Sequence, residues 1–203
     1  MKKFLALFLA SVMVFALVSC GNSEKQLPTG SNENNKYENE FIGIGCKLDD
    51  DWTFLTDEEI DELNNIAKDA VGEEIAEAIE KANIIYDMSA AKSDNTQMIN
   101  INLENLGLVY GSTMDESAYI DASIETIKTG LENMGLENIV AEKTTVTFAG
   151  KTRHAIEVSG EASGIKIYEK QVCIKAGKYM SNITAISYIE DATDEILAAF
   201  YAV

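Results

Sequence analysis

Hydrophobic and polar residues alternate along this chain with two periodicities, one typical of helices and one typical of strands. Apolar residues spaced three and four apart begin after Thr56 and continue to about Ile79, and the same spacing returns over residues 116–134. Strict alternation occurs over residues 99–103, and strand-like runs fill residues 139–188. The pattern therefore predicts two long amphipathic helices, with strands before, between and after them.

The ends of these elements carry their own signals. Thr56 and Glu59 form a capping box, in which each side chain accepts a hydrogen bond from the backbone N–H of the other residue. Gly135 stands where a helix C-cap glycine belongs, directly after the second helical run. Turn residues separate the later strands at positions 149–151, 161–164 and 177.

The segment before the first helix and the end of the chain complete the order of elements. Residues 41–48 alternate and predict a strand, with Gly43 and Gly45 on the side where another part of the chain can approach closely. The aspartates 49–51 predict a turn, and residues 191–201 predict a short terminal helix. Short turns make successive strands pair antiparallel. We therefore expect an α+β sandwich, a largely antiparallel β-sheet with helices packed on both faces.

The N-terminus has the layout of a secretory signal peptide. Lys2 and Lys3 precede an apolar run over residues 4–18, which is shorter than the roughly 20 residues that a membrane-spanning helix needs. The ending Leu17-Val18-Ser19-Cys20 resembles the lipobox of bacterial lipoprotein precursors. That resemblance implies cleavage before Cys20, a diacylglycerol thioether on Cys20, and anchoring at the extracytoplasmic face of the bacterial cell membrane.

This interpretation divides the chain into three parts. Residues 1–19 are the lipoprotein signal peptide, residues 20–36 are the lipidated cysteine and a flexible tether, and residues 37–203 are a single α+β domain. The tether is assigned from its asparagine, serine and glycine content, its lack of periodicity and the chain's one proline, Pro28. The last part has the length of one domain with a substantial core.

The charge balance limits the partners. The chain has 34 acidic and 16 basic residues and a net charge of −18. An acidic chain without a lysine or arginine cluster is a poor partner for nucleic acid or anionic lipid headgroups. The acidity either attracts cations or a basic partner, or only keeps the surface solvated. We expect membrane contact through the lipid anchor, a protein or cell-surface partner, and no cofactor.

The order of motifs and predicted elements along the chain is similar to that of a known domain. A Gly-Ile-Gly-Cys-Lys-Leu strand is followed by an acidic turn, by Trp52 and by a helix, and the chain ends in a strand meander and a short helix with Ile196, Leu197 and Phe200. This order resembles the Mog1/PsbP-like domain over about residues 37–203. The resemblance implies an antiparallel sheet with helices on both faces and a non-catalytic accessory or binding role, without any catalytic residue to transfer.

No residues form a recognised catalytic or metal motif, so we expect a protein that is not an enzyme. His154, the one histidine, alternates with apolar residues on a strand, and no Gly-x-Ser-x-Gly elbow accompanies it. Cys46 and Cys173 are too few and too separated for a zinc site with that histidine. They either form a disulfide, which export permits, or pack as buried thiols. A loose calcium site stays an alternative, built from Asp49, Asp50, Asp51 and Asp57.

Three residues are candidates for recognition of a partner. Asn100 and Asn102 lie opposite the apolar face of their strand, where they either line a polar groove, meet a partner or belong to an ordinary solvent-facing surface. Trp52 is either a recognition aromatic or a plug in the core.

These observations favour a membrane-anchored extracytoplasmic lipoprotein that acts as a non-catalytic binding or accessory module. A cell-envelope hydrolase with a site assembled only in three dimensions is the first alternative. A small solute-binding protein of a transporter is the second, although such proteins usually need two lobes around a cleft.

Overall fold

The computed structural model describes residues 29–33, 35–71 and 84–203. Cys20, the predicted signal peptide, and the part of the first predicted helix after Val71 lie outside the described residues. The strands are β1 (Ser31–Glu33), β2 (Lys36–Asn39), β3 (Ile44–Lys47), β4 (Trp52–Phe54), β5 (Ile85–Lys92), β6 (Gln97–Asn105), β7 (Glu137–Phe148), β8 (Lys151–Ala162), β9 (Ile165–Ala176), β10 (Tyr179–Tyr188) and β11 (Phe200–Ala202). The helices are α2 (Asp57–Val71), α4 (Gly107–Thr113), α5 (Glu116–Asn133) and α6 (Thr193–Leu197).

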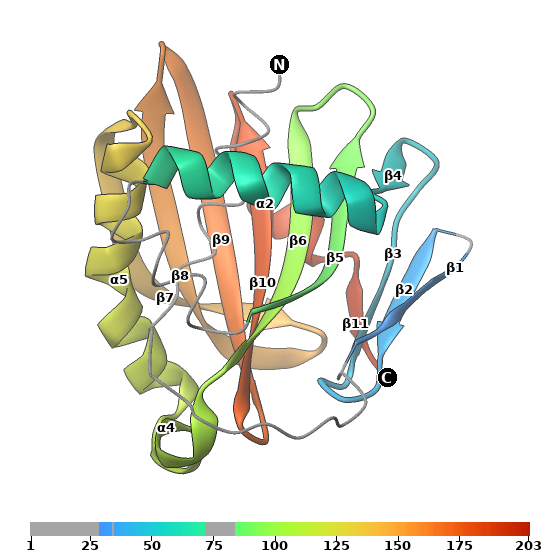
Figure 1. Ribbon diagram of the computed structural model, residues 1–203. Coiled ribbons are helices and arrows are strands. Elements are labelled where there is room, and N and C mark those ends of the chain that lie inside the picture. Colours follow the sequence, from blue (N-terminus) through green and yellow to red (C-terminus); the bar gives the residue numbers. More distant parts are fainter. Residues whose placement is uncertain (1–28, 34, 72–83) are drawn as a thin grey trace.

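Seven strands form the main sheet in the order β4-β5-β6-β10-β9-β8-β7, and every neighbouring pair is antiparallel. Figure 1 shows α2 and α5 on one face of this sheet. The central strands β6 and β10 become neighbours although α4, α5 and three strands separate them in sequence. The predicted α+β class with a largely antiparallel sheet is confirmed.

The other face is covered by a second sheet and one short helix. The second sheet has four strands in the order β1-β2-β3-β11, and α6 packs beside it against β9 and β10. Helices therefore do lie on both faces, as expected, but the four-stranded sheet shares the second face with α6. The alternation pattern did not reveal this sheet, because its strands have only three or four residues each.

The end of the chain differs from the predicted helix. The helix α6 ends at Leu197, and Phe200, Tyr201 and Ala202 instead pair with Cys46, Gly45 and Ile44 of β3. Gly45 permits this approach, since a Cβ added there would lie 2.7 Å from Cζ of Tyr201. The close approach expected at Gly45 thus exists, and its partner is a strand.

Regular structure also begins earlier than expected. Residues 31–33 and Lys36, which we assigned to the tether, belong to the β1–β2 hairpin, in which Ser31 pairs with Glu38. The predicted strand over residues 41–48 is shorter, because Gly43 adopts a left-handed φ of 70° in the turn before β3.

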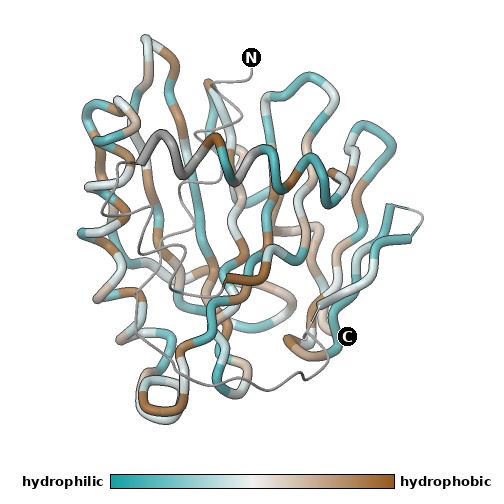
Figure 2. Tube along the Cα trace, viewed as in Figure 1, coloured by the Kyte–Doolittle hydropathy of each residue, from teal (hydrophilic) through white to brown (hydrophobic). Residues whose placement is uncertain are grey.

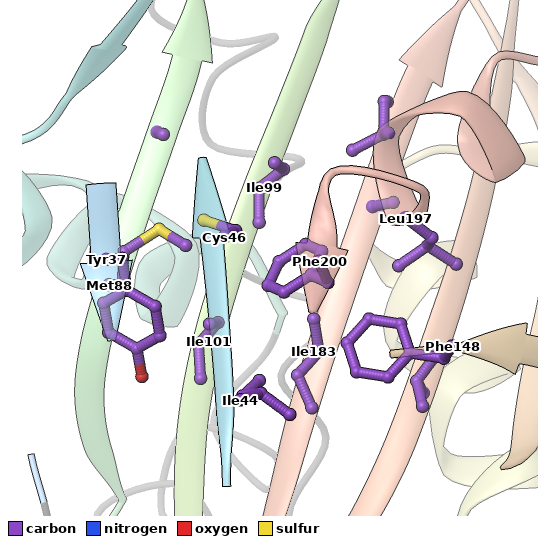
Figure 3. Packing of buried hydrophobic residues seen from close by; sticks show 14 of the residues in the cluster. Tyr37, Ile44, Cys46, Met88, Ile99, Ile101, Phe148, Ile183, Leu197 and Phe200 are labelled. Carbon is purple, nitrogen blue, oxygen red and sulfur yellow. The ribbon is translucent and has the colours of Figure 1, made fainter. Parts of the chain in front are cut away.

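Two apolar clusters lie on opposite faces of the seven-stranded sheet. The first lies between the two sheets and α6, and Figure 3 shows part of it, with side chains from both sheets and from α6 pointing toward one another. The rings of Phe148 and Phe200 are in contact there, with centroids 5.0 Å apart. The second cluster lies beneath α5 and includes Ile120, Ile127 and Leu131. Burial of these side chains supplies most of the drive to fold.

The helix boundaries follow the local signals. Glu59 N donates to Thr56 Oγ1 at 3.3 Å and Thr56 N donates to Glu59 Oε2 at 2.8 Å, which confirms the capping box. Gly135 has a φ of 87° directly after α5, as a C-cap glycine requires. Within the described part of the chain, no helix is long and apolar enough to cross a membrane.

Candidate functional site

A patch of buried polar side chains lies on the helix-facing side of the main sheet. We call it the polar floor and define it as Asn100, Asn102, Gln171, Asn182 and Thr184. Strand pairing places Thr184 of β10 beside Asn100 of β6 and Gln171 of β9, and places Asn182 beside Asn102. Each of the five residues is at most 2% exposed. Two neighbouring rows on this face, separated by one row that points to the opposite face, thus carry polar side chains in the middle of a sheet, where apolar residues are usual.

Strand alternation explains how these residues come to share one face. On β6, Ile99 and Ile101 point into the cluster between the two sheets, so Asn100 and Asn102 point toward the helices. On β10, Ile183 points the same way as Ile101, and Asn182 therefore faces α5. Tyr119 of α5 confirms the direction, because its hydroxyl oxygen accepts a hydrogen bond from Asn182 Nδ2 at 3.0 Å.

A directed chain of hydrogen bonds orients the amides of the floor. The hydroxyl of Tyr119 donates to Glu104 Oε2 at 2.7 Å, so its lone pairs are left to accept from Asn182 Nδ2. Asn182 Nδ2 also donates to Asn102 Oδ1 at 3.3 Å. Asn182 Oδ1 then accepts from Gln171 Nε2 at 3.1 Å. The Glu104 carboxylate, which fixes the first donor, therefore decides which way each amide is turned.

With the amides in this orientation, three buried polar atoms of the floor lack a hydrogen-bond partner among the described residues. These atoms are Asn102 Nδ2, Gln171 Oε1 and Thr184 Oγ1. An unpaired buried polar atom costs about 1–3 kcal/mol of stability, and most buried polar atoms in proteins are paired. The floor therefore offers one donor, one acceptor and one hydroxyl that can act as either, all from uncharged side chains.

The thiol of Cys173 and the hydroxyl of Tyr119, beside the floor, are held in their neutral forms. Burial raises the pKa of the Cys173 thiol to about 12, and Cys173 Sγ lies 3.4 Å from Asn182 Oδ1. Burial and the nearby Glu104 raise the pKa of Tyr119 well above its ordinary value. A thiol with so high a pKa is not an activated nucleophile, because the thiolate is the reactive form. The Cys173 thiol and the Tyr119 hydroxyl therefore act here as hydrogen-bonding groups.

A pocket opens beside the floor, between the first half of α2 and strands β4 and β5. Its volume is about 330 Å³, and Phe54, Ile66 and Ala91 are among its lining residues. Ala91 pairs with Met98, two residue pairs along the same strands from Ser89 and Asn100, and therefore on the same face of the sheet. The pocket thus reaches the sheet next to the floor.

The structure brings Asn100 and Asn102 together but places them in the interior. Our alternative of an ordinary solvent-facing surface for these residues is wrong, because α2 and α5 cover this face of the sheet. Trp52 lies elsewhere, 9% exposed in the cluster on the opposite face, where it also lines a cavity of about 260 Å³. Its role as a recognition residue stays a prediction.

Sequence reasoning missed the larger part of the floor. Asn182 and Thr184 alternate with Ile183 and Ala185 just as Asn100 and Asn102 alternate with their neighbours, and this repeated pattern is the signal that could have found them. Gln171 lies in a run of mixed character and gives no such signal.

The other candidates from the sequence do not assemble into a site. His154 lies on β8 opposite Thr145, half-buried, and no serine hydroxyl bonds to it within the described residues. Among residues 29–33, 35–71 and 84–203, no three histidine, cysteine, aspartate or glutamate side chains gather to hold a metal, so the loose calcium site is not formed. Cys46 and Cys173 are free and buried in the two separate clusters.

Comparisons with known proteins show distant likenesses to solved structures. No family model and no curated protein matches this sequence. Among solved structures, LpqN, involved in cell envelope biogenesis of Mycobacterium tuberculosis, is 13% identical over 76% of this chain and 75% of its own, with a TM-score of 0.41. PA94 of Pseudomonas aeruginosa, a protein of unknown function, is 12% identical over 55% of this chain and 69% of its own, with a TM-score of 0.32. Likenesses this weak carry no argument about function.

Proposed function

We propose that this protein is a lipid-anchored extracytoplasmic binding module that takes a small, uncharged, polar ligand on the polar floor and performs no chemistry on it. The observation that carries the proposal is the set of three unpaired atoms, Asn102 Nδ2, Gln171 Oε1 and Thr184 Oγ1, on three adjacent strands. A ligand that pairs with them removes a cost that the unliganded fold bears.

The chemistry of the floor narrows the class of ligand. Asn102 offers an N–H donor, Gln171 offers a carbonyl acceptor, and Thr184 can act as either. The matching ligand has a hydrogen-bond acceptor and a donor close together and carries no net charge, as a sugar or an amide does. The pocket between α2 and β5 gives the approach to the sheet beside the floor.

The lipid anchor rests on the lipobox that ends at Cys20. Two acyl chains hold a protein stably at a bilayer, since each buried methylene contributes about 0.8 kcal/mol. Globomycin, which blocks the signal peptidase for lipoproteins, should make the lipidated precursor accumulate, and Cys20→Ala should release the protein or leave it unprocessed. Indifference to both treatments would show that the anchor is absent.

Native mass spectrometry of the protein extracted from membranes tests the ligand site. We expect an additional small-molecule mass on the wild type and a threefold to tenfold weaker occupancy in Thr184→Val, the loss of about one neutral hydrogen bond. The matched control is Thr193→Val, which removes an equally buried hydroxyl on α6, on the other face of the sheet. Equal occupancy in both variants, or no bound molecule on the wild type, counts against the site.

A further inference from the structure

Four apolar side chains are exposed at one end of the molecule. Leu108 and Val109 of α4 are 84% and 70% exposed, Tyr110 beside them is 40% exposed, and Phe41 in the β2–β3 turn is 45% exposed. We call these four residues the apolar tip. Figure 2 shows a strongly hydrophobic part of α4 at the lower end of the molecule, and exposed apolar residues that gather in this way often mark an interaction site.

Contacts with the region of the β9–β10 turn hold both parts of the apolar tip in place. The helix α4 is fixed to the β9–β10 turn, because Leu106 N donates to Lys178 O at 2.9 Å and Lys175 Nζ donates to Gly111 O at 2.8 Å. Tyr179, at the start of β10, then contacts Phe41 edge to face, with ring centroids 5.7 Å apart. The exposed helix is thus joined through this turn to the β2–β3 turn.

The N-terminal part of the chain enters the fold at the same end. Gly30 N donates to Asp87 Oδ1 at 2.7 Å, and Asn39 Nδ2 donates to Asp87 Oδ2 at 2.7 Å. Asn39 Oδ1 in turn accepts from Phe41 N at 2.9 Å. One carboxylate therefore links the point of entry, Gly30, to the turn that carries the exposed Phe41, and Figure 1 shows this turn and α4 at the same end of the molecule.

We propose that the apolar tip is a membrane contact that inserts into the lipid surface next to the anchor. This inference rests on the proposed lipidation of Cys20. Gly30 follows Cys20 by ten residues, so even a fully extended chain spans at most about 35 Å between them, and a random coil spans about 17 Å. The end that carries the apolar tip is thus the end held near the bilayer.

The chemistry of this end suits the boundary between headgroups and acyl chains. Leu108 and Val109 at the extremity are aliphatic, whereas Tyr110 and Tyr179 behind them combine an apolar ring with a polar hydroxyl. Lys178 Nζ lies 5.3 Å from the ring centroid of Tyr179, where its ammonium can reach the headgroups. With a net charge of −18 the chain is not drawn to anionic lipid, so the contact depends on apolar burial and on the tether, and salt should leave it unchanged.

Site-directed spin labelling of the lipidated full chain on vesicles of phosphatidylcholine and phosphatidylglycerol tests this contact. Leu108→Cys carries the label at the apolar tip. Ile189→Cys is the matched control, since Ile189 is also apolar and 66% exposed but follows the opposite end of β10. Cys46 and Cys173 are buried, with a pKa of about 12 each, and do not react with the label. Collision rates with oxygen, which concentrates in lipid, and with a water-soluble nickel chelate report the depth of each label.

We expect the ratio of oxygen to nickel collisions to be several-fold higher for the label at position 108 than for the label at position 189, in low and in high salt. Equal ratios at the two positions would overturn the proposal. So would a label at position 108 that is shielded from both reagents, because that result indicates burial against protein. The mass of the mature chain reports lipidation separately, so a missing anchor is distinguishable from an apolar tip that stays in water.

Discussion

The substitution Thr184→Val tests the physical basis of the polar floor most directly. Thr184 is fully buried at the centre of the main sheet, and its Oγ1 has no hydrogen-bond partner among the described residues. Valine has the same branched shape and the same preference for strands, so the replacement changes little except the hydroxyl. The variant therefore isolates the cost of one unpaired oxygen.

The expected gain follows from that cost. Removing an unpaired buried hydroxyl should raise the free energy of unfolding by about 1–2 kcal/mol. For a domain of this size that gain corresponds to a rise of about 2–8 °C in melting temperature. Most core substitutions of a polar residue destabilise a protein, so a rise of this size is a specific result.

Urea unfolding followed by tryptophan fluorescence measures the effect, because the single tryptophan, Trp52, is buried in the core. The control is Thr193→Val, where the hydroxyl donates to Asp191 Oδ1 at 2.7 Å and its removal should cost about 1–2 kcal/mol. If Thr184→Val lowers stability as much as Thr193→Val does, the hydroxyl of Thr184 is paired, and the reasoning behind the floor is refuted.

Four further predictions follow from the contacts and the burial described. Tyr119→Phe should lower the free energy of unfolding by about 2–3 kcal/mol in urea, because it removes the hydroxyl that accepts from Asn182; an unchanged midpoint would contradict the directed chain of hydrogen bonds. Asp194→Asn should lower the free energy of unfolding by about 1–2 kcal/mol in the same assay, since it leaves the nearly buried ammonium of Lys170 without the carboxylate that lies 2.7 Å away. An unchanged free energy of unfolding would indicate that this pair behaves as an ordinary surface salt bridge. The two buried cysteines should resist alkylation in the native protein and react in denaturant. Burial raises the pKa of each thiol from its ordinary value near 9 to about 12, so the thiols of the unfolded chain ionise first as the pH rises. The free energy of unfolding should therefore fall above about pH 9. Thermal melts between pH 7 and 10 that show no decline in melting temperature would argue against this burial.

Much of the architecture is predictable from local signals. The capping box at Thr56 and Glu59, the glycine after α5 and the alternation along β6 each depend on a few neighbouring residues, and each is present in the fold. Such features are predictable because a cap, a turn or a repeat of two or 3.6 residues is set by the conformational preferences and the amphipathic pattern of the segment itself.

The second sheet shows where this reasoning ends. The last residues, Phe200 to Ala202, read as a continuation of a helix, yet they pair with β3, which lies near the other end of the chain. Three residues carry too little periodicity to distinguish a strand from a helix. Their conformation is decided by the free edge of β3 and by the space for Tyr201 against Gly45.

The sequence by itself indicated the kind of protein: an α+β domain whose two longer helices and principal strands can be placed from periodicity, preceded by a segment that resembles a lipobox. Only the tertiary structure decided where function can reside. Asn102 and Asn182 are 80 residues apart and meet because β6 and β10 become neighbours in the sheet. Which strands become neighbours, and in what register, depends on the free energy of the whole packed sheet, and no single segment contains that information.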